Sequence, residues 1–177
     1  MDLHLPANRF QMQEASNRDP LKTLKEDVQA GLLNMPRSLP SKYFYDDEGS
    51  KLFSAICNTE DYYPACTELD LLKQHTEEIV KIVQPKTFVE LGAGTSTKTE
   101  ILLSKLDART DLYTYFTIDI CKDILVKSAQ RLLKIYPSLQ IKSLIGEYVP
   151  AIQAISKLDS PALFLFIGSS IGNFTEQ

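Results

Sequence analysis

The chain has 177 residues, of which 44% are hydrophobic and 24% are charged, and this ordinary balance predicts a soluble globular protein with its own core. The net charge of -4 and the scattering of Lys and Arg argue against a nucleic-acid partner. The longest apolar stretch, residues 161–168, is too short to cross a bilayer, and the N-terminus lacks the regions of a signal peptide. We therefore expect a cytoplasmic protein without membrane or nucleic-acid partners.

The three cysteines, Cys57, Cys66 and Cys121, do not form an even set and show no CxxC spacing. This pattern fits reduced thiols in a cytosolic protein better than a disulfide framework or a metal site. We therefore expect no bound metal.

The first part of the chain is predicted to be a tail followed by helices. Residues 1–19 are polar and aperiodic, so we expect them to be disordered or loosely docked. A helical segment is expected over residues 20–84, because Asp19-Pro20 pairs an N-cap with a proline at the first helical position. Further helices are predicted near residues 50–57 and, as a long amphipathic stretch, over residues 65–83.

Residues 85–177 alternate between apolar runs and helical patterns, which predicts an α/β domain with a Rossmann-like sheet. Strands are expected at residues 87–91, 115–118, 141–145 and 162–167, and helices at residues 98–106, 122–136 and near 150–157. The last strand is an almost unbroken apolar run, which is typical of a strand buried on both faces.

The stretch F-V-E-L-G-A-G-T-S at residues 88–96 is the most informative part of the chain. It predicts a strand that turns sharply at Gly92 and Gly94 into a helix opened by Lys98, with free N–H donors at the helix start. Glu90 ahead of the glycines would repel a pyrophosphate but tolerates an ammonium or a sulfonium. We therefore expect the turn to bind S-adenosylmethionine.

Two simpler interpretations remain open for this region. The third glycine of the GxGxxG pattern is replaced by Thr97, and the turn could be an ordinary helix cap with Thr95, Ser96 or Thr97 as the N-cap residue. Asp119, at the end of the second predicted strand, stands where Rossmann folds bind ribose hydroxyls, but it could equally cap the next helix.

Four motifs carry a more specific signal. They are S-L-P-S-K-Y-F-Y-D-D-E-G-S-K-L-F, D-Y-Y-P-A-C-T-E, V-E-L-G-A-G-T-S-T-K-T and F-I-G-S-S-I-G-N-F-T, in this order over residues 36–176. In this combination the chain resembles the histidine-specific Nα-methyltransferases of ergothioneine biosynthesis, over about the N-terminal half of a family member.

The resemblance implies both a reaction and a fold. Members of this family use S-adenosylmethionine to methylate the α-amine of L-histidine three times, which gives hercynine. Their fold is a class I methyltransferase sheet joined to a substrate-binding part, which is formed by N-terminal helices and C-terminal sequence. Residues 20–84 are thus expected to contribute to substrate binding, and residues 85–177 to form a partial domain that binds S-adenosylmethionine.

The resemblance also assigns roles to the candidate cofactor residues. Gly92 and Lys98 match residues at the methionine part of the cofactor, and Asp119 matches the residue that holds the ribose. Glu147 and Tyr148 stand in place of an Asp-Phe pair that brackets the adenine. Glu147 is a departure from that pair, and its longer side chain shifts the expected contact to the adenine amine.

On the substrate side, Tyr62 matches the residue that contacts the imidazole and Asn173 the residue that binds the carboxylate. The residues that match the pocket near the amine are Tyr45, Phe53, Gly168 and Ser170. The α-ammonium must lose a proton before each attack, and either Tyr45 or bulk water could relay it.

Several of these residues also have a plain structural interpretation. Tyr45 and Tyr62 could be aromatic plugs whose hydroxyls bind backbone, and Phe53 could simply be a core residue. Asn173, after Gly172, could be a turn residue.

The function of the chain as it stands is open to alternatives. A complete methyltransferase sheet would have further strands after residues 162–167, so we expect this chain to be a fragment. We expect it to methylate histidine weakly or not at all, with the missing C-terminal half as a possible partner. The alternatives are an NAD-dependent dehydrogenase, a non-catalytic remnant that binds a partner through its sheet edge, and a methyltransferase for another small amine.

Overall fold

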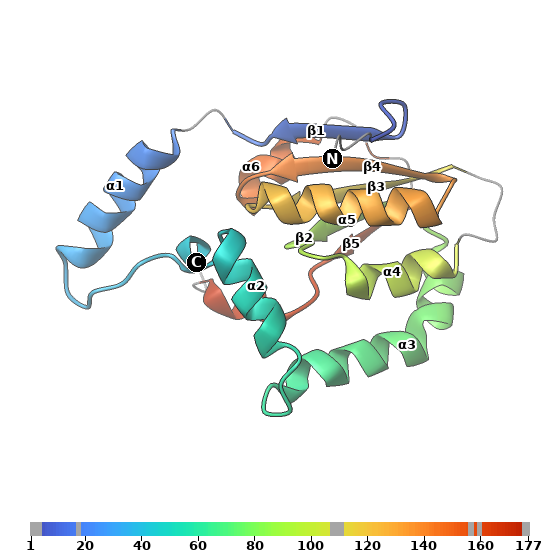
Figure 1. Cartoon of the computed structure of the whole chain (residues 1–177), viewed down its shortest axis with the longest axis horizontal. Coiled ribbons are helices and arrows are strands. Elements are labelled where there is room, and N and C mark those ends of the chain that lie inside the picture. The colour runs from blue at the N-terminus through green and yellow to red at the C-terminus, as the bar shows by residue number, and fades with distance from the viewer. Residues whose placement is uncertain (1–4, 17–18, 107–111, 156–157, 159–160, 175–177) are drawn as a thin grey trace.

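The computed structural model describes residues 5–16, 19–106, 112–155, 158 and 161–174. Within these residues the core is one parallel sheet in the order β1-β4-β3-β2-β5 (Figure 1). Its strands are β1 (Phe10–Glu14), β2 (Thr87–Leu91), β3 (Tyr113–Asp119), β4 (Leu139–Ile145) and β5 (Ala162–Leu165). The predicted Rossmann-like α/β fold is confirmed, and in the described part of the chain β5 pairs with β2 alone.

The helices follow the predicted pattern to within a few residues. They are α1 (Pro20–Leu32), η1 (Ser41–Phe44), α2 (Asp47–Ile56), α3 (Tyr63–Val83), α4 (Thr97–Ser104), α5 (Lys122–Ile135), α6 (Tyr148–Ala154) and η2 (Ser169–Asn173). Asp19 caps α1 as expected, because its side chain accepts a hydrogen bond from the Leu21 N–H at 3.0 Å. The predicted end of the helix near residues 150–157 lies partly outside the described residues.

The expectation of a disordered or loosely docked tail over residues 1–19 is wrong for residues 10–14. These residues form β1, which pairs in parallel with β4 at the sheet edge. The sequence F-Q-M-Q-E alternates apolar and polar side chains, which is the period of an edge strand. Arg9 strengthens the attachment by donating hydrogen bonds of 3.1 Å to the carbonyl oxygens of Leu133 and Tyr136 at the end of α5. Residues 1–4 and 17–18 of that tail lie outside the described residues.

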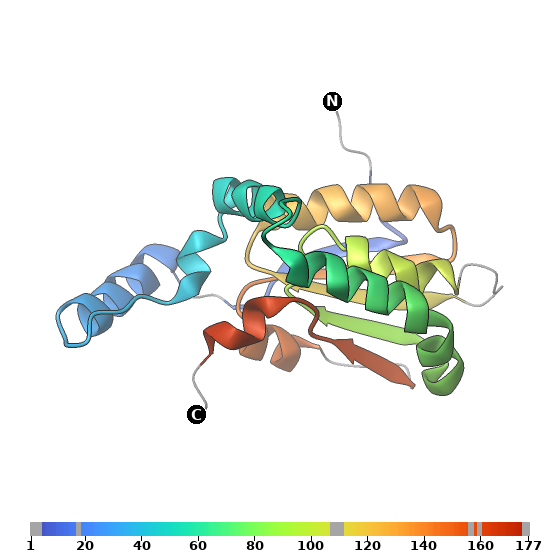
Figure 2. The same cartoon turned by 90° about the horizontal axis from the view of Figure 1, so that it is seen from below.

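The sheet separates two apolar clusters, because successive side chains of a strand point to opposite faces. Phe88 and Tyr115 pack with α4 and α5 on one face, whereas Val89 and Phe116 pack with Ala151 of α6 on the other. Figure 2 shows α4 and α5 on one side of the sheet and α6 on the other. This three-layer core supports the strand ends on which the site is built.

The first two helices, α1 and α2, lie outside this core. Neither α1 nor α2 has a fully buried residue, and both figures show α1 standing apart from the sheet (Figures 1 and 2). Polar contacts attach α1 to η1: the Tyr43 hydroxyl donates to Asp27 at 2.6 Å, and the Lys42 ammonium pairs with the same carboxylate at 2.8 Å. No helix in the described residues is long and apolar enough to cross a membrane.

Candidate functional site

The candidate site lies where the order of the strands reverses. From β2 the chain adds β3 and β4 on one side, while β5 pairs with β2 on the other side, so the order of the strands reverses between β2 and β5. Sheets of this type bind ligands at such a point. A cavity of about 510 Å³ is found there, between the end of α2, the start of α3, the turn after β2, the first residues of α4 and residues 167–170.

The glycine turn brings backbone close to this cavity. Gly92 and Gly94 have φ values of +71° and +48°, a left-handed conformation that glycine adopts without strain. A Cβ at Gly92 would lie 2.8 Å from the hydroxyl oxygen of Tyr148. Ser96 is the N-cap residue of α4, but its side chain makes no capping bond, and its hydroxyl instead forms a hydrogen bond of 3.0 Å with the Tyr115 hydroxyl. The turn is therefore shaped by backbone and close packing rather than by a side-chain cap.

Glu90 is buried beneath the turn and accepts a hydrogen bond from the Tyr115 hydroxyl. Burial raises the pKa of Glu90 to about 7, against the opposing effect of that hydrogen bond. Near neutral pH this side chain is therefore divided between its neutral and ionised forms. A developing cation above the turn would favour the ionised form, whereas a phosphate would not.

Asp119 ties β3 to the glycine turn. Its Oδ2 accepts a hydrogen bond of 2.9 Å from the Gly94 N–H, and its Oδ1 accepts one of 3.0 Å from the N–H of Cys121, the N-cap residue of α5. Burial raises the pKa of Asp119, and the backbone donors oppose that shift. Asp119 therefore does not cap α5, whose N-cap residue is Cys121; it holds the glycine turn and the chain after β3 together, and its ribose-binding role stays a prediction.

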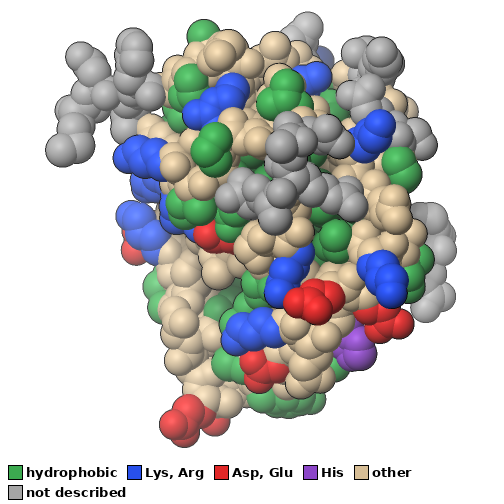
Figure 3. Space-filling model, turned by 90° about the vertical axis from the view of Figure 1, so that its right-hand side faces the viewer, with side chains coloured by type: hydrophobic (Ala, Val, Ile, Leu, Met, Phe, Trp, Pro, Cys, Tyr) green, Lys and Arg blue, Asp and Glu red, His purple; other side chains and the backbone are tan. Residues whose placement is uncertain are grey.

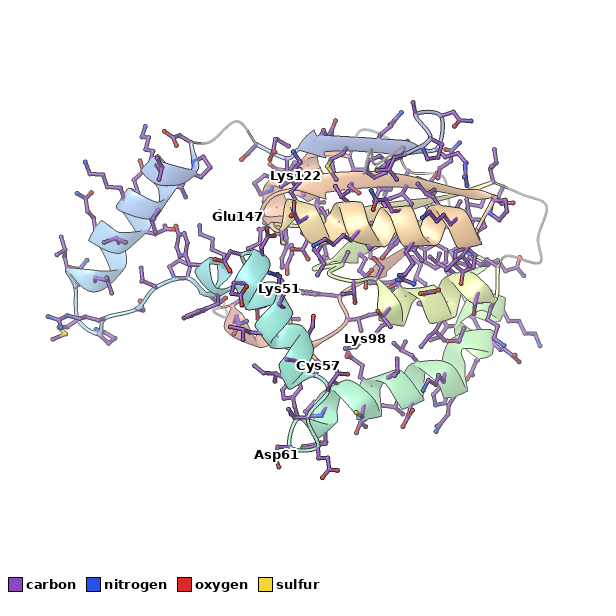
Figure 4. The ribbon with its side chains drawn as sticks, viewed as in Figure 1. Lys51, Cys57, Asp61, Lys98, Lys122 and Glu147 are labelled. Atoms are coloured by element: carbon purple, nitrogen blue, oxygen red, sulfur yellow. The ribbon has the colours of Figure 1, made fainter. Side chains whose placement is uncertain are left out.

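Glu68 was not singled out from the sequence, although it ends the motif D-Y-Y-P-A-C-T-E. Its Oε2 pairs with the Lys98 ammonium, and its Oε1 accepts a hydrogen bond of 2.7 Å from the Gly168 N–H. Figure 4 shows Lys98 in the space between α4, α3 and the end of α2, where Cys57 lies. Cys57, Glu68, Lys98 and Gly168 all line the cavity.

Part of the cavity wall is aromatic. The ring centroids of Tyr45 and Phe53 are 6.0 Å apart, and those of Phe53 and Tyr62 are 6.2 Å apart, both in edge-to-face contact. The Tyr62 and Ser169 hydroxyls form a hydrogen bond of 2.9 Å that joins α3 to the segment after β5. Phe53 and Tyr62 line the cavity, and Tyr45 adjoins it through Phe53.

Tyr148 lies beside the glycine turn, with its hydroxyl near Gly92. Its ring packs against Phe166 and Phe174, with centroid distances of 5.2 and 5.7 Å. Burial raises the pKa of the Tyr148 hydroxyl, with a smaller effect from the Asp119 charge and an opposing hydrogen bond with Ser170. Tyr148 is therefore in place beside the turn at Gly92.

Two predicted residues lie elsewhere. Glu147 forms an ion pair of 2.9 Å with Lys42 of η1, so in this structure its carboxylate is turned to the N-terminal segment (Figure 4). Asn173 ends η2 and is exposed. Among the described residues, neither lines the cavity.

The structure thus brings most of the predicted site residues to one region. Those that line the cavity are Phe53, Tyr62, Glu90, Gly92, Lys98, Gly168 and Ser170. Gly94 is part of the glycine turn, Asp119 accepts a hydrogen bond from its N–H, and Tyr148 lies next to Gly92. The described residues contain no group of three or more His, Cys, Asp or Glu side chains that could hold a metal ion, and the three cysteines are free thiols.

Comparison with known proteins decides the family. Residues 24–177 match the family described as histidine-specific methyltransferases that depend on S-adenosylmethionine. The chain belongs to this family. The resemblance inferred from the four motifs is confirmed. The alternative of an NAD-dependent dehydrogenase is therefore excluded.

Three relatives show to which known proteins the chain is similar. The chain is 36% identical to histidine N-alpha-methyltransferase of Mycobacterium tuberculosis (strain CDC 1551 / Oshkosh), over 86% of this chain and 47% of that protein. It is 30% identical to ergothioneine biosynthesis protein 1 of Schizosaccharomyces pombe, over 78% and 19%. It is 28% identical to the 4-dimethylallyltryptophan N-methyltransferase of Trichophyton verrucosum, over 87% and 47%. The chain spans about half the length of the first of these relatives.

The charged residues that line the cavity can be compared with the chemistry of the family's methyl donor. These residues are Glu68, Glu90 and Lys98. Two carboxyl groups and one ammonium suit a ligand that carries an ammonium, a carboxylate and a sulfonium. On the face shown in Figure 3 the Lys and Arg side chains are interspersed with acidic and apolar ones.

Proposed function

We propose that this chain forms the part of a histidine Nα-methyltransferase that binds S-adenosylmethionine and one wall of the substrate pocket. The observation that carries the proposal is the cavity at the reversal of strand order, where the glycine turn, Lys98 and the Tyr62–Ser169 contact meet in a chain of this family. A relative named histidine N-alpha-methyltransferase supports L-histidine as the substrate and hercynine as the product.

The cofactor is proposed to lie against the turn after β2. When bound, S-adenosylmethionine would supply an electrophilic methyl group. Lys98 offers an ammonium for a carboxylate, Gly92 and Gly94 allow close approach of a ligand to the backbone, and Asp119 has carboxylate lone pairs beyond those used by its two backbone donors. Glu147 and Tyr148 are proposed for the adenine, which requires Glu147 to leave its ion pair with Lys42.

The substrate is proposed to lie in the cavity with its imidazole at Tyr62 and its amine near Tyr45, Phe53, Gly168 and Ser170. Asn173, which does not line the cavity in this structure, is proposed for the substrate carboxylate. Aromatic edges and hydroxyls suit an imidazole, which is flat and carries one donor and one acceptor when neutral. The cavity walls hold the amine in line with the methyl group, and the exclusion of water strengthens charge interactions. Together these two effects supply much of the acceleration in a displacement that needs no covalent help from the protein.

Tyr45 is proposed to relay the proton that the substrate ammonium loses. Its ring adjoins the cavity through Phe53, and it is half-buried. Glu90 is less suited to that task, because its carboxyl group is enclosed under the turn and bound to Tyr115.

The proposal is tested by calorimetric titration of the whole chain, first with S-adenosylhomocysteine and then with L-histidine. We expect micromolar cofactor binding that is lost in Asp119→Ala and weakened in Asp119→Asn. The matched control is Asp123→Ala, because Asp123 is an exposed carboxylate in the first turn of α5, four residues after Asp119. A folded chain that binds no S-adenosylhomocysteine would overturn the proposal.

A second candidate substrate is a different amino acid amine. The relative from Trichophyton verrucosum is named as acting on 4-dimethylallyltryptophan, and it matches 87% of this chain. With S-adenosylhomocysteine bound, separate titrations with histidine and 4-dimethylallyltryptophan distinguish the two. Tighter binding of the tryptophan derivative would favour the second candidate.

Because the chain spans about half the length of the M. tuberculosis relative, we expect it to turn histidine over weakly or not at all by itself. Detectable hercynine formation by the purified chain would contradict that expectation. A cytoplasmic location is part of the proposal and is supported by the three free thiols.

A further inference from the structure

Glu68 joins three elements that meet at the cavity. It lies near the start of α3, and its two carboxylate oxygens have different partners, the Lys98 ammonium in α4 and the Gly168 N–H after β5. These partners are 30 and 100 residues away along the chain. One carboxylate therefore links the N-terminal helical segment to both strand ends that form the site.

The Glu68 contacts are partly shielded from water. The side chains of Glu68 and Lys98 are 33% and 27% exposed, and both line the cavity. Charge-assisted hydrogen bonds in such surroundings are stronger than those at the open surface. The segment that contains Gly168 is held by α3 a second time, through the bond between Tyr62 and Ser169.

A second ion pair between the same two helices provides a contrast. Glu77 of α3 and Lys105, directly after α4, pair at 2.6 Å, but their side chains are 78% and 43% exposed. Neither residue lines the cavity. Glu77 and Glu68 thus share the same helix and the same kind of partner, and they differ in their relation to the site.

We infer that Glu68 is a positioning residue of the methyl-transfer site, a role that rests on the function proposed above. Its carboxylate holds the Lys98 ammonium on the cofactor side and the Gly168 N–H on the substrate side. Because Glu68 belongs to α3 and contacts both groups, it sets the distance between the cofactor side and the substrate side of the cavity. Glu68→Gln removes the charge that holds Lys98 and keeps an acceptor for Gly168, whereas Glu68→Ala releases both.

The first experiment needs no ligand. The chain has 7 glycines, so labelling with ¹⁵N-glycine gives a spectrum in which the Gly168 amide can be assigned and its hydrogen exchange followed. We expect Gly168 exchange about tenfold faster or more in Glu68→Ala, and close to the unchanged chain in Glu68→Gln and in the control Glu77→Gln. Equal Gly168 exchange in Glu68→Ala and the unchanged chain would overturn the inference.

The second experiment measures S-adenosylhomocysteine affinity by calorimetry. We expect Glu68→Gln to weaken binding about tenfold and Glu77→Gln to leave it unchanged. In a Lys98→Met background, Glu68→Gln should cause no further loss, because the charge of Glu68 acts through Lys98. A full additional loss in that background would overturn this route of action.

The two experiments separate this inference from the proposed function. If the unchanged chain binds no S-adenosylhomocysteine, the proposed function and the positioning role fail together, while the exchange data still decide whether Glu68 holds Gly168. If the cofactor binds and the Glu68 variants match Glu77→Gln in both experiments, the proposed function stands and the inference about Glu68 is overturned.

Discussion

Helices α4 and α5 bury leucines completely against the sheet, whereas α1 and α2 bury no residue fully although the sequences of α1 and α2 are amphipathic. Leu132 of α5 is 0% exposed and Leu21 of α1 is 76% exposed. The sheet region is thus held by apolar packing, and the N-terminal helices are held by polar contacts such as Tyr43–Asp27 and Lys42–Glu147. The candidate site lies on the boundary between the two regions, with α3 on one side and the glycine turn on the other.

This difference bears on how the site is maintained. Apolar packing resists small changes of position, because each buried side chain has many neighbours, whereas a hydrogen bond at a partly exposed surface competes with water. We therefore expect the glycine turn at Gly92 and Gly94, the proposed cofactor wall, to be rigid, and the proposed substrate wall around Tyr62 and Gly168 to depend on a few polar contacts. The predictions that follow test this contrast, from the largest expected effect to the smallest.

The largest effect is expected in the core. Leu132→Ala leaves a cavity in the cluster between α5 and the sheet, so we expect unfolding to become easier by about 3 kcal/mol. Leu21→Ala in α1 should change the free energy of unfolding by less than about 0.5 kcal/mol. Urea unfolding measures both. A loss at Leu21 as large as that at Leu132 would show that α1 is packed, and would remove the contrast.

Glu90 gives the sheet region a pH dependence. Its pKa in the folded chain, about 7, is above the ordinary value of 4.5, so folding disfavours ionisation and stability falls as pH rises from about 4.5 to 7. Glu90→Gln cannot ionise, so its stability relative to the unchanged chain should rise by about 2 kcal/mol between pH 5 and pH 8. Urea unfolding at each pH measures this difference.

The control for the pH series is Glu60→Gln, since Glu60 is exposed. Its unfolding free energy should follow that of the unchanged chain at every pH. If the Glu90→Gln variant also runs parallel to the unchanged chain, the proposed buried state of Glu90 is wrong.

Gly92 tests the rigidity of the cofactor wall at a single position. Alanine there must adopt a φ of +71° and bring its Cβ within 2.8 Å of the Tyr148 hydroxyl, so Gly92→Ala should cost about 1 kcal/mol and weaken S-adenosylhomocysteine binding. Gly172→Ala is the control, because a Cβ at Gly172 meets nothing within 4 Å. Thermal unfolding and calorimetry measure the pair. Equal binding by both variants would mean that the turn tolerates a side chain.

How far the sequence predicts this molecule follows from the range of its contacts. The strands of the sheet and the turn at Gly92 were predictable, because apolar runs and glycine spacing are local patterns. The edge strand at residues 10–14 was missed, since its partner β4 lies about 130 residues away and only the alternation of Phe10 and Met12 marks it. Glu68 was missed for a similar reason, because its partners lie far along the chain.

The placement of the predicted site residues depends on the range of contacts in the same way. Residues tied to the strand ends, such as Gly92 and Gly168, line the cavity as expected. Glu147 instead pairs with Lys42, a contact over 105 residues that no local pattern indicates. Polar contacts between distant segments therefore set the part of the site that sequence patterns leave undetermined.

The smallest effect is expected where α1 meets η1. Tyr43→Phe removes the hydroxyl that donates to Asp27 at 2.6 Å but leaves the Lys42–Asp27 ion pair, so we expect a local loss of about 1 kcal/mol or less. Hydrogen exchange of α1 amides should become faster while the urea transition of the sheet stays in place, because α1 buries no residue fully. Tyr63→Phe, at a ring that is 70% exposed, is the matched control and should leave α1 exchange unchanged. If Tyr43→Phe shifts the urea transition as far as Leu132→Ala does, α1 and the sheet unfold as one unit, and the two regions are held together by more than these polar contacts.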